Sequence, residues 1–121
     1  MAFNLFKKKK AEPVTNAAID FSSIDSQEKA VQLYVGKQLV KLYLMPLAFG
    51  GEDNPLNVLY VPAFVNFYKD RFDIMIENLL LEGKELNYSA VPEYKGNSFI
   101  PGSLLISVSG DAKFQETINI W

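Results

Sequence analysis

The stretch YVPAFVNFYKDRFDIMIENLLLEG, residues 60–83, decides the fold, because its apolar residues keep a helical period for about twenty positions. The residues that follow the rhythm of one buried stripe are Val65, Tyr68, Phe72, Met75, Ile76 and Leu79. The residues expected to widen that stripe are Phe64, Phe67, Ile74 and Leu81. The polar residues expected on the opposite, solvated face are Asn66, Asp70, Asp73 and Glu77. Pro62 suits a first helical turn and Gly83 suits an exit, so we predict a core-forming helix over residues 62–82.

The segments around this helix predict an α+β domain. Asp25 and Glu28 have the spacing of a capping box, which predicts a helix that begins near Asp25 and ends at Gly36. Residues 38–47 and 58–61 are typical of strands, and three later segments alternate with period two: residues 86–90, 104–108 and 114–120.

The predicted order is therefore α-β-β-α-β-β-β. It favours a two-layer fold with a largely antiparallel sheet and the long helix packed on one face. We expect a flexible basic tail and linker over residues 1–19 and a single globular domain over residues 20–121.

Two absences from the composition limit the possible functions. The chain of 121 residues contains no Cys and no His. This excludes disulfides, thiolate metal sites and catalysis that needs a Ser–His–Asp or Cys–His arrangement. An enzyme would have to use carboxylates, Lys, Tyr or a Ser–Lys pair. No phosphate-binding loop, dinucleotide fingerprint or nucleophile elbow occurs, so we expect no catalytic role and no cofactor or metal.

The charge is unevenly distributed. The formal net charge is −2, but without Lys7, Lys8, Lys9 and Lys10 there are 8 basic residues against 14 acidic ones. A body that acidic repels nucleic-acid phosphates, so a nucleic-acid partner is not expected. No apolar run is long enough to cross a membrane, and the first residues lack the order of a signal peptide. We expect a cytoplasmic protein.

The segment MAFNLFKKKK has two interpretations. Its apolar residues Phe3, Leu5 and Phe6, followed by the four lysines, would suit weak peripheral contact with an anionic membrane. Three apolar residues are too few for stable anchoring, and a solvated tail explains the same pattern. We favour the solvated tail.

The segment AFGGEDNPLN, residues 48–57, is the most conspicuous loop. Gly50 and Gly51 permit unusual backbone angles, and the residues after them are typical of turns. Its three oxygen-bearing side chains belong to Glu52, Asp53 and Asn54. Their spacing is not that of a calcium loop, so a tight turn or a partner-facing loop is the better interpretation. The candidate partner-binding residues are Gly50, Gly51, Glu52, Asp53, Asn54, Asp70 and Asp73.

Two segments resemble known bacterial proteins. GGEDNPLNVLYVP, residues 50–62, resembles a segment of small bacterial proteins found near polymorphic-toxin systems. NYSAVPEYKGNSFIPGSLLISVSG, residues 87–110, is similar to strand pairs near the end of secreted bacterial nuclease toxins. Those toxins need a catalytic His, which this chain lacks. The resemblance covers 37 of the 121 residues and implies an immunity-type protein rather than a toxin.

Three hypotheses follow. The first is a non-enzymatic cytoplasmic protein that binds a partner with a basic surface, as an immunity-type inhibitor of a toxin would. The second is a structural or oligomerising domain whose sheet edge pairs with another copy. The third is an enzyme that uses carboxylates or Lys.

Overall fold

The structure, a computed structural model, describes residues 19–121. The proposed membrane contact by Phe3, Leu5, Phe6 and the lysines at positions 7–10 lies outside the described residues, as does most of the expected linker. In the described part, a helix, two strands, a second helix and three strands follow one another. The strands there pair antiparallel. The predicted α+β class and the predicted element order are therefore confirmed.

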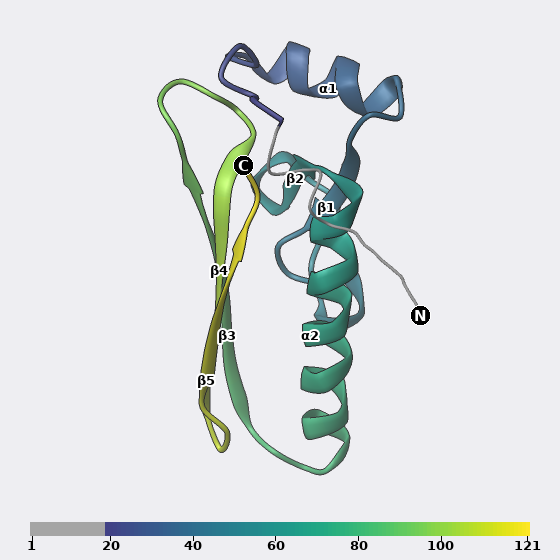
Figure 1. Cartoon of the computed structure of the whole chain (residues 1–121). Helices are drawn as coiled ribbons and strands as arrows, with labels where there is room; N and C mark the ends of the chain where they lie inside the picture. Colours follow the sequence, from purple (N-terminus) through teal and green to yellow (C-terminus); the bar gives the residue numbers. More distant parts are fainter. Residues whose placement is uncertain (1–18) are drawn as a thin grey trace, which may run out of the picture.

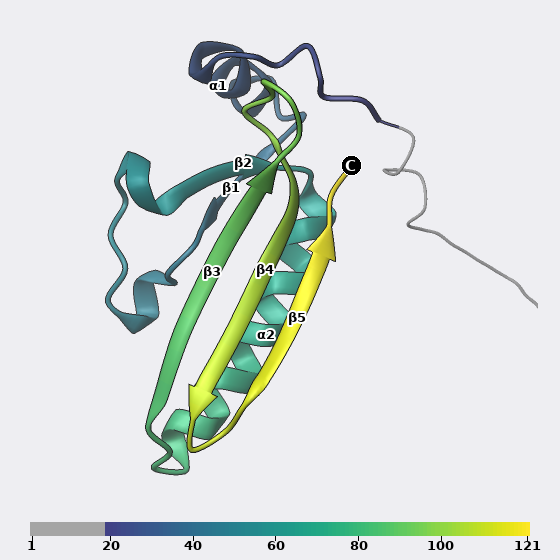
Figure 2. The same cartoon turned by 90° about the vertical axis from the view of Figure 1, so that its left-hand side faces the viewer.

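The strands of the described residues form two sheets, whereas the sequence predicts one. β1 (Val40–Tyr43) and β2 (Val58–Val61) make a two-stranded ladder. β3 (Leu86–Tyr94), β4 (Pro101–Gly110) and β5 (Phe114–Asn119) make a three-stranded meander with β4 in the centre. Figure 2 shows the meander as a long sheet, with the β1–β2 pair beside its upper part.

The long helix α2 (Ala63–Leu81) runs along one face of the meander (Figure 1). Val65 and Ile76 are buried on its inner side, as the helical period predicts. Pro62 precedes the first turn instead of forming part of it. Gly83 has a φ of 89°, a left-handed backbone that Gly adopts without strain just beyond a helix.

The first helix, α1 (Gln27–Val35), begins slightly later than predicted. Ser26 is its N-cap, because the Oγ of Ser26 accepts a hydrogen bond from the N–H of Lys29 at 3.2 Å. Asp25 instead accepts a hydrogen bond from the Nζ of Lys29 at 2.8 Å. The predicted capping box of Asp25 and Glu28 is therefore wrong, and the N-cap lies one residue later, at Ser26.

The strand β1 is shorter than the predicted strand over residues 38–47. Beyond it, the backbone of Met45 pairs with a side chain instead of a strand. The N–H of Met45 donates to Asn57 Oδ1 at 2.7 Å, and Asn57 Nδ2 donates to the carbonyl of Met45 at 2.9 Å. The side chain of Asn57 thus makes the two hydrogen bonds that a further strand residue would make, and the β1–β2 ladder ends there.

The core of residues 19–121 consists of two clusters of buried side chains. The larger one lies between α2, the meander and the β1–β2 pair, and contains Leu42, Leu59, Val61, Val65, Leu104, Ile106, Ile118 and Ile120. The smaller one lies under α1 and contains Phe21, Ala30, Leu39 and Ile100. Trp121 packs against both clusters, and its indole N–H donates to the carbonyl of Ile100 at 2.9 Å. Trp121 therefore joins the two parts of the core.

The outer side of α2 differs from the prediction. Phe67, Ile74 and Leu81 are 63%, 57% and 80% exposed, although the sequence predicts that they widen the buried stripe. These three residues, called the outer stripe below, are spaced by seven positions and so lie on one line along the helix. The helix packs on the meander with its other side, and this explains why the outer stripe is exposed.

Candidate functional site

The loop between β1 and β2 contains most of the predicted partner-binding residues. It includes two short 3₁₀ turns, Leu47–Phe49 and Pro55–Asn57. Gly50 has a φ of 97°, which favours Gly. At Gly51 a Cβ atom would collide with the carbonyl oxygen of Met45, so only Gly fits there. The two glycines therefore serve the backbone path of the loop.

The polar side chains of this loop are engaged mainly within it. Asp53 forms an ion pair with Lys41 on β1 at 3.4 Å. Asn54 accepts a hydrogen bond from the N–H of Leu56 at 3.0 Å, and its Nδ2 donates to Glu52 Oε1 at 3.4 Å. These contacts support the turn interpretation. Within residues 19–121, no three carboxylates are placed to share a metal ion.

The two predicted acids on α2 have different environments. Asp70 is exposed, as expected. Asp73 is half-buried and accepts two hydrogen bonds from the Nζ of Lys69, at 3.1 and 3.0 Å. Lys69 itself is only 2% exposed. The expectation that Asp73 lies on a solvated face is therefore wrong, because the buried lysine holds it against the sheet.

Burial opposes both charges of this ion pair. It lowers the pKa of the Lys69 amine, against the attraction of the Asp73 carboxylate, and it raises the pKa of Asp73 in the same way. The Nζ of Lys69 also lies 5.6 Å from the ring centroid of Tyr88 on β3, a cation–π distance. Lys69 therefore links the helix to the meander.

Tyr88 continues this link to the β1–β2 loop. Its hydroxyl donates a hydrogen bond to the carbonyl of Leu44 at 2.9 Å. Burial raises the pKa of the Tyr88 phenol, and the nearby charge of Asp73 raises it further. Asp73, Lys69 and Tyr88 thus connect α2, the meander and the residue that follows β1. Sequence reasoning missed this cluster, although Lys69 and Asp73 have the i, i+4 spacing of helical ion pairs.

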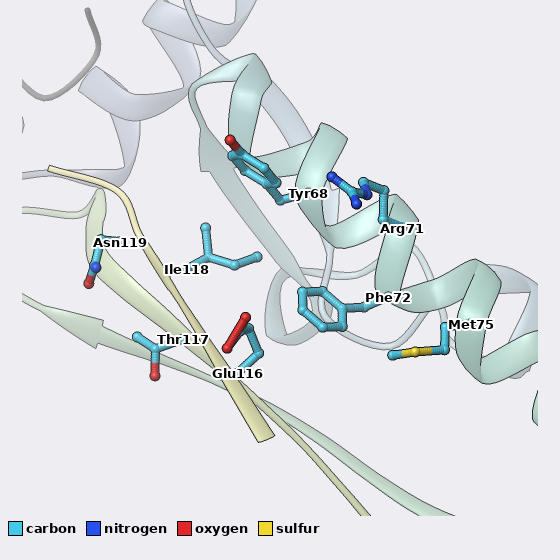
Figure 3. Close-up of a pocket in the computed structure, with 8 residues that line it drawn as sticks. All are labelled: Tyr68, Arg71, Phe72, Met75, Glu116, Thr117, Ile118 and Asn119. Carbon is cyan, nitrogen blue, oxygen red and sulfur yellow. The ribbon is translucent and has the colours of Figure 1, made fainter. Parts of the chain in front are cut away.

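A groove of about 470 Å³ separates α2 from the edge strand β5. Its helix wall consists of Tyr68, Arg71, Phe72 and Met75, and its strand wall consists of Glu116, Thr117, Ile118 and Asn119. Figure 3 shows Ile118 pointing toward the helix, whereas Thr117 and Asn119 point away from it. Glu116 alternates with Thr117 and so shares the inner face with Ile118. The groove therefore contains one acid, Glu116, and one base, Arg71, between apolar side chains of its two walls.

The groove continues onto exposed apolar surface. Tyr68 and Met75 on its helix wall are 42% and 40% exposed, and they lie beside the outer stripe. The rings of Phe67 and Tyr68 contact each other with centroids 5.9 Å apart. We call the groove together with the outer stripe the α2–β5 face. Sequence periodicity identified these side chains as apolar but placed the outer stripe in the core.

The β5 backbone offers hydrogen-bonding groups at the outer edge of the meander. The N–H of Ile120, just beyond β5, donates to the carbonyl of Gly102 at 2.7 Å and so points toward β4. In an antiparallel ladder this direction alternates between successive residues. Gln115, Thr117 and Asn119 therefore direct their N–H and C=O groups to the free edge. The meander order leaves β5 without a second neighbouring strand in the described residues.

Comparison of the chain with protein-family models, with curated proteins and with solved structures found no match. Among the helices of residues 19–121, neither is long and apolar enough to span a membrane.

Proposed function

We propose that this chain is a non-enzymatic protein-binding domain and that it binds its partner through the α2–β5 face. The observation that carries the proposal is the outer stripe, whose three large apolar side chains are all more than half exposed. Single exposed apolar residues are ordinary, but three large ones along one line of a helix, beside a groove with a partly apolar lining, mark an interaction surface.

The free edge of β5 supports the same proposal. An edge strand with unpaired N–H and C=O groups accepts another strand by β-augmentation, in which backbone hydrogen bonds supply affinity and side-chain pockets supply specificity. Here the groove beside β5 is the pocket. Phe72 on the helix wall and Ile118 on the strand wall supply apolar surface, and Arg71 and Glu116 place one charge of each sign there.

The alternative of an enzyme that uses Lys has less support. Lys69 is the most deeply buried lysine of residues 19–121, but it donates two hydrogen bonds to Asp73 and does not line the groove. The cluster of Lys69, Asp73 and Tyr88 connects elements of the fold, and this is a sufficient reason for its burial. The charged loop residue Asp53 likewise has a partner in Lys41.

Site-specific photo-cross-linking tests the proposal. A benzophenone amino acid replaces Phe67 on the outer stripe, and the matched control carries it at Phe99, an aromatic residue that is 46% exposed outside the α2–β5 face. We expect position 67, and not position 99, to give an adduct with one protein that mass spectrometry identifies. Equal yields from the two positions, or no adduct from position 67, would contradict the proposal.

The immunity-type role is a narrower form of this proposal. It requires that the protein captured at position 67 is a toxin. A basic toxin surface would suit Asp70 and Glu77, two acids of α2 that are exposed near the outer stripe. Reversal of both charges is expected to weaken such a complex. Unchanged binding would contradict the idea that Asp70 and Glu77 bind a basic toxin surface.

A further inference from the structure

We propose that the partner of the α2–β5 face is a second copy of this chain, with the two β5 strands paired antiparallel across a two-fold axis at Thr117. This inference rests on the proposed function and names its partner. The pairing would join two three-stranded meanders into one sheet of six strands, with both α2 helices on the same side.

The direction of the backbone groups selects the residues that pair. Because Gln115, Thr117 and Asn119 direct their N–H and C=O groups outward, a two-fold axis at Thr117 places all three in hydrogen-bonded pairs. Thr117 then lies opposite Thr117 of the second copy, and Gln115 lies opposite Asn119. These polar side chains are on the solvated face of the sheet, where such cross-strand pairs are favourable.

The charge of Glu116 selects this register over its neighbour. A two-fold axis at Glu116 would place two carboxylates directly opposite each other, which is destabilising. With the axis at Thr117, each Glu116 instead lies opposite Ile118 of the other copy. The inner face then brings apolar residues of both copies together, since Ile118 is buried and Phe114 is half-buried on this face.

The positive charge on the helix wall of one copy's groove is complementary to the negative charge on the strand wall of the other copy's groove. Arg71 and Glu116 line the same groove, yet neither forms an ion pair with another described residue. A two-fold axis between the grooves brings Arg71 of each copy toward Glu116 of the other. The contact of Arg71 with Glu116 would occur twice across the axis, as in any isologous interface, and the two ion pairs would neutralise four charges.

Exposed apolar side chains on the groove side of α2 would be covered by this pairing. Tyr68 and Met75 are 42% and 40% exposed there, beside the β5 edge. The outer stripe lies on the side of α2 that faces away from the meander, so pairing of the β5 edges leaves it uncovered. The interface is therefore smaller than the standard of about 800 Å² per partner, and it suits a weak, reversible dimer.

Sedimentation equilibrium of the full chain measures the oligomeric state directly. We expect a reversible dimer at about 100 µM protein. Thr117→Pro removes an N–H that points away from β4, so it blocks edge pairing and spares the β4–β5 ladder. We expect this variant to keep the fluorescence of Trp121 and to associate at least about tenfold more weakly.

A charge exchange keeps the proposal testable if Thr117→Pro fails to fold. Arg71→Glu alone and Glu116→Arg alone are each expected to weaken dimerisation. The double variant is expected to restore it, because the pair is re-formed across the axis. Double-variant dimerisation as weak as that of the single variants would overturn the assigned contact.

A single engineered cysteine tests the register, because the chain has no Cys of its own. Paired residues at the axis have Cα atoms about 5.5 Å apart, within the range of a disulfide. We expect Thr117→Cys to form a disulfide-linked dimer on oxidation. Ser89→Cys, on the solvated face of the opposite edge strand β3, is the matched control and is expected to stay monomeric.

The outcomes separate this inference from the proposed function. A chain that is monomeric at about 100 µM overturns the second-copy proposal. If the benzophenone at position 67 then captures a different protein, the protein-binding function stands without it. If it captures nothing, both proposals fail. Equal disulfide yields at positions 117 and 89 would show that edge pairing through β5 is not specific.

Discussion

Replacing Asp73 with Ala should destabilise the protein far more than replacing its partner Lys69 with Met. Asp73→Ala leaves the ammonium of Lys69 in the core with no carboxylate beside it. Lys69 is 2% exposed, so water cannot fully take the place of the two hydrogen bonds it loses. The exposed face of α2 is unaffected, because neither side chain reaches it.

The structure sets the size of this effect. Breaking a fully buried ion pair from one side costs about 3–5 kcal/mol. The side chain of Asp73 is 20% exposed, so water can partly solvate the Lys69 ammonium once the carboxylate is removed. We therefore expect a loss of unfolding free energy at the lower end of this range, about 3 kcal/mol. Lys69→Met removes the more deeply buried charge and keeps the volume. Its cost is expected to be about 1 kcal/mol, because the carboxylate left behind is closer to solvent.

The double variant Lys69→Met/Asp73→Leu removes both charges. Burial disfavours both of them, since it lowers the pKa of Lys69 and raises the pKa of Asp73. We therefore expect the double variant to lie within about 1 kcal/mol of the wild type, or above it in stability. The pair would then specify how α2 sits on the meander rather than supply stability.

Urea unfolding measured by the fluorescence of Trp121 gives all four free energies, because the chain has one Trp. With an m-value of about 1.5 kcal/mol/M, a loss of 3 kcal/mol lowers the midpoint by about 2 M. Asp73→Ala within about 0.5 kcal/mol of the wild type would refute the burial of an unpaired ammonium. A double variant as unstable as Asp73→Ala would refute the claim that the pair is replaceable.

Three further predictions use the same assay. Gly51→Ala is expected to lose at least about 2 kcal/mol because its Cβ meets a backbone oxygen, whereas Gly50→Ala, which has free space but a φ of 97°, should lose about 1 kcal/mol. Tyr88→Phe should lose about 1 kcal/mol near neutral pH, through the hydrogen bond to Leu44. The folded protein raises the pKa of Tyr88, so this contribution is complete below the ordinary value of 10.0 and is lost as the pH rises above it. The gap between the wild type and Tyr88→Phe should therefore narrow above pH 10, and a constant gap would contradict the assigned burial. Ser98→Ala should lose about 2 kcal/mol, since the Ser98 hydroxyl is buried and bridges two backbone groups.

The long helix and the alternating strands were predictable because each is encoded by a local period. Residues 62–82 and the observed Ala63–Leu81 agree closely, since Val65 and Ile76 recur at helical spacing and Gly83 marks the exit. The same period misplaced the outer stripe. Periodicity reports which residues share a side of a helix, but the width of the covered side depends on what packs there.

Lys69 and the two sheets were not predictable for a different reason. Lys69 lies on the inner side of α2, yet lysine is rarely buried, and its burial here depends on Tyr88, nineteen positions later in the chain. The separation of β1 and β2 from the meander depends on α2, which follows β2 directly and leads the chain to β3. The burial of Lys69 and the division of the strands into two sheets therefore both depend on segments that are distant in sequence. The sequence likewise points to charged residues as the candidate site, whereas the α2–β5 face is mainly apolar.

The bridge made by Ser98 has a consequence for the order of folding. The described strands pair only with strands that neighbour them in the chain, so these ladders close over short stretches of sequence. By contrast, the hydroxyl of Ser98 donates to the carbonyl of Phe21, 77 residues away, and the N–H of Phe99 donates to the carbonyl of Ile24 at 2.7 Å. Closing the long loop between Phe21 and Ser98 costs conformational entropy. The contacts that offset this cost form only once the meander has folded. The segment that carries α1 should therefore join last during folding and detach first during unfolding.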